Sequence, residues 1–284
     1  MIYLKLVLVA LIWGGSFIAT RVIAQSFEPF IASCIRYLIS IVLLLPLAFK
    51  GNRKFLSVTK SQFWLLILMG FSGIFIYNFF FFKGLQLVPA SHGALLVALN
   101  PSMVIILSAI WYREKINGLQ AIGVILSLLG VMLVISRGQL STLLSDFQLG
   151  DAYMLACPFA WAIYTLAGRE ALKKVSPIDA TTWAALSGLV MLLLFAFTEQ
   201  IPSSITPKIW AGFAYLGILS TVIAFIWYND GIKEIGATKT SIFNNLVPVF
   251  ALLLSVLILH EQVSSYTWIG GFLVIGGVLL TNRF

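Results

Sequence analysis

The polar side chains best suited to chemistry in this chain lie inside long apolar stretches. Arg36 stands in one such stretch, and Asn100, Asn244 and Asn245 stand in two others. A charge or an amide within a membrane is costly unless it is hydrogen-bonded or serves a solute pathway. An arginine can bind the carboxylate of a solute, and an amide can both donate and accept hydrogen bonds. These residues favour recognition of a small solute over a chemical reaction.

Each of these residues also has a structural interpretation. Arg36 could extend toward the membrane surface and pair with Glu28. Buried asparagines also join membrane helices to one another. The sequence leaves both interpretations open.

Groups that could catalyse a reaction or bind a metal are not arranged for it. His260 and Glu261 lack the second histidine of a zinc-binding helix, and His92 has no serine motif to serve. Cys34 and Cys157 lie in apolar stretches, where cysteine acts as a small buried hydrophobe. We therefore expect no enzyme, no cofactor and no metal.

The composition places the chain in a membrane. Hydrophobic residues make up 60% and charged residues 10%, and the mean hydropathy is +1.01. A helix needs roughly 20 apolar residues to cross the hydrocarbon core, and long continuous runs favour helices over barrel strands. We predict an all-α membrane protein with ten transmembrane helices, near residues 3–23, 29–49, 62–82, 91–111, 117–136, 152–168, 178–198, 209–229, 239–259 and 265–282.

The two halves of the sequence repeat each other. Residues in the first half recur 147 or 148 positions later, as in Trp13 and Trp161, Gly84 and Gly231, Pro101 and Pro248, and Glu114 and Glu261. Because each unit holds five predicted spans, the second unit must run opposite to the first, which is typical of inverted-repeat transporters. We predict two inverted five-helix repeats, residues 1–138 and 149–284.

Basic residues cluster on alternate loops. Thirteen lysines and arginines, among them Arg53, Lys54 and Arg283, fall on one predicted face together with both termini, and five fall on the other. The positive-inside rule places the first face and both termini in the cytoplasm. The net charge of +8 is therefore attributed to membrane topology and not to nucleic-acid binding.

Several motifs resemble those of a known transporter family. The segment 13–17 (WGGSF), followed by Arg21 and Pro29, resembles the opening of the EamA-like family of the drug/metabolite transporter superfamily. The segments 215–221, 227–229 and 244–250 and Glu261 are also similar to that family. The resemblance covers both halves. It implies ten helices that carry small organic metabolites across the inner or plasma membrane, usually outward.

Aromatic and polar side chains are the candidates for the solute pathway. Pro101 and Pro248 each free the carbonyl group four residues earlier, which points both prolines toward a cavity between the halves. Polar residues without a counterpart in the other half are the best candidates for recognition. The predicted substrate-binding residues are Trp13, Ser16, Arg36, Tyr77, Asn78, Asn100, Trp161, Tyr164, Trp227, Ser241, Asn244 and Asn245.

Charged residues at the span ends predict two gates. Glu114 and Arg169 lie at the predicted cytoplasmic face, whereas Glu261 and Arg21 lie at the outer face. The repeat exchanges these two pairs. We predict two equivalent ion pairs that latch opposite gates.

We predict an exporter of small amphipathic metabolites, such as amino acids, that works by alternating access. A lipid-linked carrier flippase, a nucleoside or organic-cation exporter and a small-solute channel remain alternatives. An exporter should enclose a mid-membrane cavity of about 300 Å³ or more. The predicted partners are a small-molecule substrate and the lipid bilayer, without nucleic acid. Because no acid falls at mid-membrane, we expect facilitated diffusion or exchange, or coupling through Asp230 or Glu234.

Overall fold

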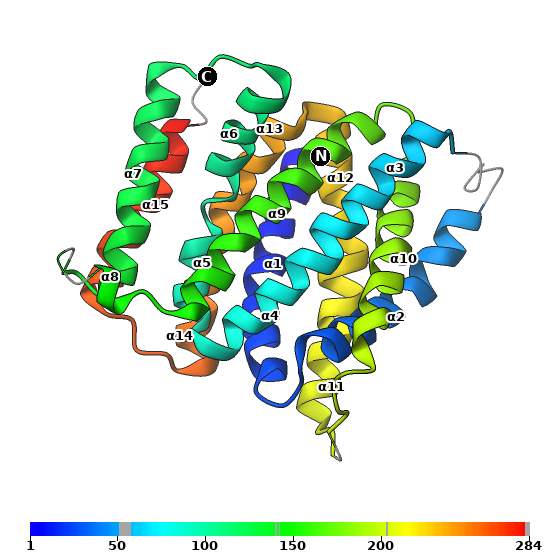
Figure 1. The fold of residues 1–284 in the computed structure, drawn as a ribbon, viewed down its shortest axis with the longest axis horizontal. Coiled ribbons are helices and arrows are strands. Elements are labelled where there is room, and N and C mark those ends of the chain that lie inside the picture. The colour runs from blue at the N-terminus through cyan, green and yellow to red at the C-terminus, as the bar shows by residue number, and fades with distance from the viewer. Residues whose placement is uncertain (51–57, 140, 142, 203, 282–284) are drawn as a thin grey trace.

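The computed structural model describes residues 1–50, 58–139, 141, 143–202 and 204–281, so Arg53, Lys54 and Arg283 lie outside the described residues. Within these ranges the regular elements are helices, and no strand occurs. The helices lie side by side in one bundle (Figure 1). The first turn of α1 and the last turn of α15 lie at the same end of it, the upper end in Figure 1.

The first half of the chain forms eight helical elements. They are α1 (Ile2–Ala24), α2 (Pro29–Phe49), α3 (Lys60–Met69), the π-helix η1 (Gly70–Ile76), α4 (Tyr77–Leu87), α5 (Ala90–Val97), α6 (Asn100–Tyr112) and α7 (Gly118–Ile135). The elements α3, η1 and α4 are continuous. A short helix α8 (Leu143–Asp146) connects the halves.

The second half repeats this order. It contains α9 (Leu149–Ala171), α10 (Pro177–Ala196), α11 (Pro207–Ala214), the π-helix η3 (Tyr215–Ile223), α12 (Ala224–Ile235), α13 (Ala237–Ser241), the 3₁₀ turn η4 (Ile242–Asn245), α14 (Leu246–Leu259) and α15 (Ser265–Thr281). The two π-helices occupy equivalent positions.

Eight helical segments of the described chain are long and apolar enough to cross a membrane. They are Ile2–Ala24, Pro29–Phe49, Lys60–Leu87, Ala90–Tyr112, Gly118–Ile135, Pro177–Ala196, Pro207–Ile235 and Lys239–Leu259. The prediction of an all-α membrane protein is therefore confirmed. The helices α9 and α15 are not among the eight: α9 is less apolar than those segments, and the described part of α15 has 17 residues.

Close helix contacts recur at the repeat offset. A Cβ atom on Gly70 would lie 2.7 Å from the carbonyl oxygen of Ala184, and one on its counterpart Gly217 would lie 3.0 Å from that of Arg36. Ala184 and Arg36 are themselves 148 positions apart. Only glycine permits these backbones to approach so closely. The same interhelical contact is thus made twice.

The fourth and ninth predicted spans are each interrupted near their prolines. α5 ends at Val97, and α6 restarts at Asn100 just before Pro101. In the second half, the 3₁₀ turn η4 separates α13 from α14, which contains Pro248. Proline lacks the backbone N–H that would continue the helical hydrogen bonds. Both breaks lie beside the central cavity.

Candidate solute-binding cavity

Aromatic rings from both halves meet at the centre of the bundle. Trp13 of α1 and Trp161 of α9, which are repeat counterparts, pack edge to face with their ring centroids 5.1 Å apart. Tyr228 lies 5.0 Å from Trp13, and Tyr77 lies 5.5 Å from Trp161. The Trp13 Nε1–H donates to the carbonyl oxygen of Ser220 at 3.1 Å. The indole N–H is thereby satisfied within the apolar interior.

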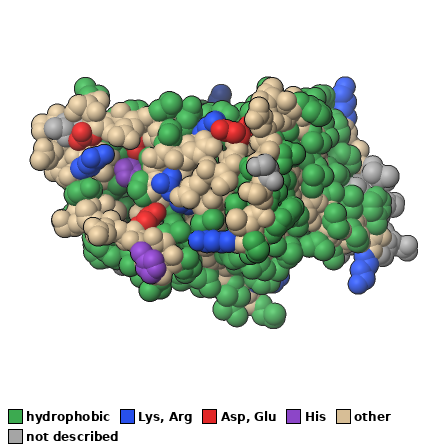
Figure 2. Space-filling model, turned by 90° about the horizontal axis from the view of Figure 1, so that it is seen from below, with side chains coloured by type: hydrophobic (Ala, Val, Ile, Leu, Met, Phe, Trp, Pro, Cys, Tyr) green, Lys and Arg blue, Asp and Glu red, His purple; other side chains and the backbone are tan. Residues whose placement is uncertain are grey.

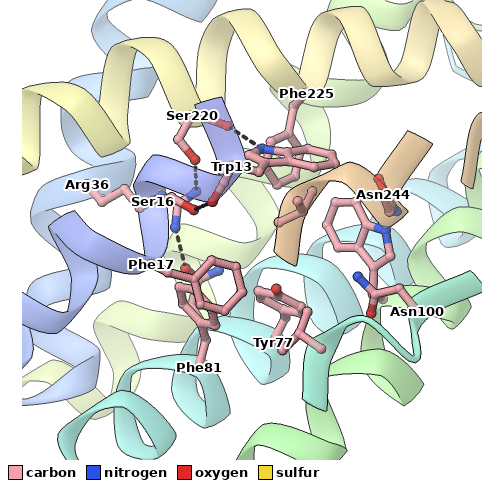
Figure 3. Close-up of a pocket in the computed structure, with 14 residues that line it drawn as sticks. Trp13, Ser16, Phe17, Arg36, Tyr77, Phe81, Asn100, Ser220, Phe225 and Asn244 are labelled. Carbon is pink, nitrogen blue, oxygen red and sulfur yellow. Dashed lines mark hydrogen bonds between the residues drawn. The ribbon is translucent and has the colours of Figure 1, made fainter. Parts of the chain in front are cut away.

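The rings of Trp13, Tyr77 and Trp161 border a cavity of about 40 Å³ (Figure 3). This volume accommodates about three water molecules, so the predicted cavity of about 300 Å³ is wrong for this structure. The mutual packing of the rings occupies the space. Elements of both halves line the cavity: Trp13, Ser16, Phe17, Arg36, Tyr77, Asn78, Phe81, Val97, Asn100, Trp161, Ser220, Phe225, Asn244 and Val247.

Arg36 forms one wall of the cavity and is only 4% exposed. Its Nε donates to Thr221 Oγ1 at 2.9 Å, its Nη1 to Asn78 Oδ1 at 3.0 Å and its Nη2 to Ser220 Oγ at 3.3 Å. All three partners are neutral. The hydrogen bonds hold the guanidinium group in place without neutralising its charge.

Glu28 does not compensate that charge. Its carboxylate instead pairs with Lys83 at 2.6 Å, so the alternative pairing of Arg36 with Glu28 is wrong. Among the residues the structure describes, no carboxylate bonds to Arg36. A buried cation that faces a cavity and lacks an acidic partner favours an anionic ligand.

Two amides form the wall across from Arg36 (Figure 3). Asn100 Oδ1 and Asn244 Nδ2 are buried, and neither has a hydrogen-bond partner in the described part of the chain. Their repeat counterparts are Val247 and Val97, which also line the cavity. Each half thus contributes one asparagine and one valine to the cavity, with the two residue types exchanged between equivalent positions. The cavity offers a cation at one side, amides at the other and aromatic rings between them.

Four predicted site residues do not line the cavity: Tyr164, Trp227, Ser241 and Asn245. Tyr164 stacks behind Trp161 at 4.8 Å, where its hydroxyl accepts from Asn229 Nδ2 at 3.0 Å. Ser241 and Asn245 are buried elsewhere in the helix break.

Trp227 was expected on the cavity face because it follows Ser220 at α-helical spacing. The π-helix η3 has more residues per turn than an α-helix, which rotates the following residues about the axis. Phe225 therefore lines the cavity, and Tyr228 contacts Trp13, whereas Trp227 is only half-buried outside it.

Six lining residues were not predicted: Phe17, Phe81, Val97, Ser220, Phe225 and Val247. Phe17 and Phe81 follow Trp13 and Tyr77 by four residues, so helical spacing alone could have identified both. Val97 and Val247 could have been found as the counterparts of the two asparagines. Ser220 lies on the same predicted helix face as Trp227, and the π-helix obscured the position of Phe225.

The predicted ion pair between Glu114 and Arg169 is present. Arg169 Nη1 lies 2.8 Å from Glu114 Oε1, and Ser108 Oγ donates to Glu114 Oε2 at 2.7 Å. The hydrogen bonds from Ser108 and Arg169 lower the pKa of the Glu114 carboxyl. The pair connects the end of α6 to the end of α9, and so joins the two halves at one end of the bundle.

The predicted ion pair between Glu261 and Arg21 is wrong. Glu261 accepts hydrogen bonds from the backbone N–H groups of Ala90 at 2.9 Å and Ser91 at 3.1 Å, and from Ser91 Oγ at 2.6 Å. Arg21 donates to the carbonyl oxygens of Leu85 and Gln86. Each charge thus binds the helix end of opposite polarity, the start of α5 or the end of α4.

Glu261 nevertheless joins the halves, because it links the loop after α14 to α5. A second link lies nearby, where His92 Nε2 of α5 is 2.7 Å from Asp151 Oδ1 of α9. Figure 2 views this end and shows charged and histidine side chains gathered over its left and central part, surrounded by hydrophobic side chains. Different contacts therefore join the two halves at the two ends of the bundle.

Comparison with known proteins agrees with this architecture. Residues 1–136 and 148–283 each match the EamA-like transporter family. The uncharacterized transporter YyaM of Bacillus subtilis (strain 168) is 32% identical over 286 residues, which cover 99% of this chain and 93% of that protein. An uncharacterized transporter of Archaeoglobus fulgidus is 31% identical over 284 residues, covering 99% and 96%. A crystal structure with 22% sequence identity shares the fold, with a TM-score of 0.71 over 98% of this chain and 94% of that one. This chain belongs to the EamA-like transporter family.

Proposed function

We propose that this transporter exports small amphipathic metabolites that carry a carboxylate, such as amino acids, by alternating access. The observation that carries the proposal is the buried guanidinium group of Arg36, which faces a ring-lined cavity without an acidic partner. A carboxylate binds Arg36, the apolar body of the solute lies among the rings, and a distal polar group meets Asn100 and Asn244. The positive wall disfavours organic cations.

The proposed architecture is ten transmembrane helices in two inverted repeats, residues 1–138 and 149–284, in the cell membrane. The repeated glycine contacts, the paired π-helices and the equivalent breaks at Pro101 and Pro248 support it. In this arrangement α9 and α15 also cross the membrane, and both termini are cytoplasmic. The shared position of the first and last helix ends supports placing both termini on one side of the membrane, and the excess of basic residues supports the cytoplasmic side.

The small cavity fits an occluded state of the transport cycle. The solute enters when the rings separate, which requires the two halves to move against each other. The contacts of Glu114 with Arg169 and of Glu261 with α5 are placed to close opposite ends. No acid lines the cavity within the described chain, which favours diffusion or exchange over a central proton relay.

Counterflow into liposomes that contain the purified protein tests this function. We expect accumulation of labelled solute when the lumen holds unlabelled carboxylate-bearing amphiphiles, and no accumulation with organic cations or nucleosides. Protein-free liposomes are the control. Counterflow of cations or nucleosides but not carboxylates would contradict the substrate class, and flipping of a lipid-linked carrier would contradict the proposed mechanism.

A further inference from the structure

A second cavity opens on the membrane-facing side of the bundle. It has a volume of about 400 Å³ and lies between α1, α11 and α14, bordered by Leu11, Ile18 and Val22 on one side and by Leu254 on the other. Lys208, the second residue of α11, stands at its rim. This volume is ten times that of the central cavity and lies within the range of small-molecule binding sites.

The length of this groove matches one leaflet of the bilayer. Val22 lies near the end of α1, and Leu11 lies near its middle. Eleven residues of α-helix rise about 16 Å, which is about half of the ~30 Å hydrocarbon core. The groove therefore extends from the membrane surface to mid-membrane, the depth reached by one acyl chain.

The groove has no equivalent at the repeat-related position in the described part of the other half. Gly15 and Gly212 border it, and their counterparts in the other half are the bulky residues Ile163 and Leu65. The counterpart of Ile18 is Leu166, which is buried in a cluster with Val104 and Ala162 and packs against Leu107 and Tyr112. The equivalent region of the other half is thus packed by protein side chains. On the side of Lys208, Gly15 leaves room for the hydroxyl of Tyr215 and Gly212 leaves room for Ile23, and the groove stays open beside them.

Lys208 at the rim and Trp210, which belongs to the same helix but does not line the groove, are residue types typical of a membrane interface. Lys208 is exposed and forms no ion pair with the residues that the structure describes. Trp210, two residues later, is 49% exposed, and tryptophan is enriched at the level of lipid headgroups. A basic residue near the membrane surface attracts anionic lipid.

We propose that this groove binds one anionic phospholipid, with an acyl chain between α1, α11 and α14 and the phosphate at Lys208. This lipid is distinct from the transported solute and does not depend on its identity. It fills a space that the packing of the helices leaves open, and it stabilises the folded protein by binding it selectively.

Native mass spectrometry of the delipidated protein tests the proposal. Phosphatidylglycerol and phosphatidylcholine with identical chains would be titrated separately. We expect one phosphatidylglycerol to bind about five-fold more tightly, because one lysine contributes about 1 kcal/mol to anionic lipid binding near a surface. Lys208→Gln should abolish this preference, whereas Lys60→Gln, at an exposed lysine of the opposite end, should retain it.

Filling the groove tests where the chain lies. Gly212→Leu introduces the residue found in the other half, and its new Cβ would lie 3.2 Å from Ile23 Cδ1, so the Ile23 side chain must shift slightly. We expect both lipids to bind at least five-fold more weakly. Ala211→Leu, at an exposed lining position, provides a second filled variant if the first does not fold. The proposal would be overturned if Lys208→Gln still preferred phosphatidylglycerol or if the filled variants bound lipid as the unmodified protein does. Competition by glycerol phosphate as strong as that by the lipid would also overturn it.

Discussion

In the proposed function, Arg36 is the residue on which recognition of the solute depends most directly. Arg36→Gln removes the charge but can still hydrogen-bond the neighbouring hydroxyl groups. We expect counterflow of carboxylate solutes to fall at least ten-fold, because a hydrogen bond to a charged group contributes about 1.5–3 kcal/mol. Arg36→Lys should give an intermediate rate, since the charge remains but the planar fork is lost. Unchanged counterflow in a folded Arg36→Gln protein would remove the carboxylate from the proposal, and Lys174→Gln serves as the control.

Substitution of Asn100 can distinguish a role in solute recognition from a role in folding stability. Because its Oδ1 has no partner in the described structure, Asn100→Leu should change the free energy of unfolding by less than about 1 kcal/mol while lowering transport. Asn229 is the matched control. Its Nδ2 donates to Tyr164 OH at 3.0 Å and to Thr181 Oγ1 at 2.8 Å, so Asn229→Leu should cost about 2 kcal/mol or more. Thermal unfolding and counterflow of both variants measure the contrast, and equal destabilisation would show that Asn100 is structural.

At the scale of elements, the sequence predicted what hydropathy and proline chemistry determine. Apolar runs predicted the all-helical membrane fold, and Pro101 and Pro248 marked where two spans are distorted beside the cavity. The π-helices could not be read from residue spacing, since their sequences remain good α-helix formers, and this misplaced Trp227. Repeat symmetry likewise predicted the Glu114 pair correctly but the Glu261 pair wrongly. The repeat preserves the backbone arrangement in both halves, whereas each carboxylate binds the hydrogen-bond donors that lie near it.

The contact between α6 and α9 should respond to pH. The hydrogen bonds that lower the pKa of Glu114 stabilise the fold above the ordinary glutamate pKa, and this stability is lost as the pH falls through the lowered value. Both side chains are more than one-third exposed, so the pair contributes only about 0.2–1 kcal/mol. Glu114→Gln should therefore lower the unfolding midpoint at pH 7 but not near pH 3. Glu234→Gln is the control, because Glu234 is exposed and forms no ion pair with the residues that the structure describes. A deficit that persists at pH 3 would contradict this account.

At the scale of the whole molecule, the central helices have a different composition from the peripheral ones. α9 packs against α3, α4 and α6 and carries Trp161 and Tyr164 into the core. α7 and α15 pack mainly on each other and present large apolar side chains outward, at the left of Figure 1. A helix surrounded by protein needs less apolar surface than one facing lipid. Low hydropathy is therefore compatible with a membrane-spanning α9.

Single cysteines on either side of α9 test whether it crosses. Leu144, before the helix, is 93% exposed, and Lys174, after it, is also exposed. In a background with Cys34 and Cys157 replaced by alanine, we expect a membrane-impermeant maleimide to label Leu144→Cys from outside intact cells. Lys174→Cys should react only after the membrane is permeabilised, because the proposed orientation places the end of α9 in the cytoplasm. Labelling of both cysteines from the same side would show that α9 does not span, and would leave an unequal number of crossings in the two halves and no inverted repeat.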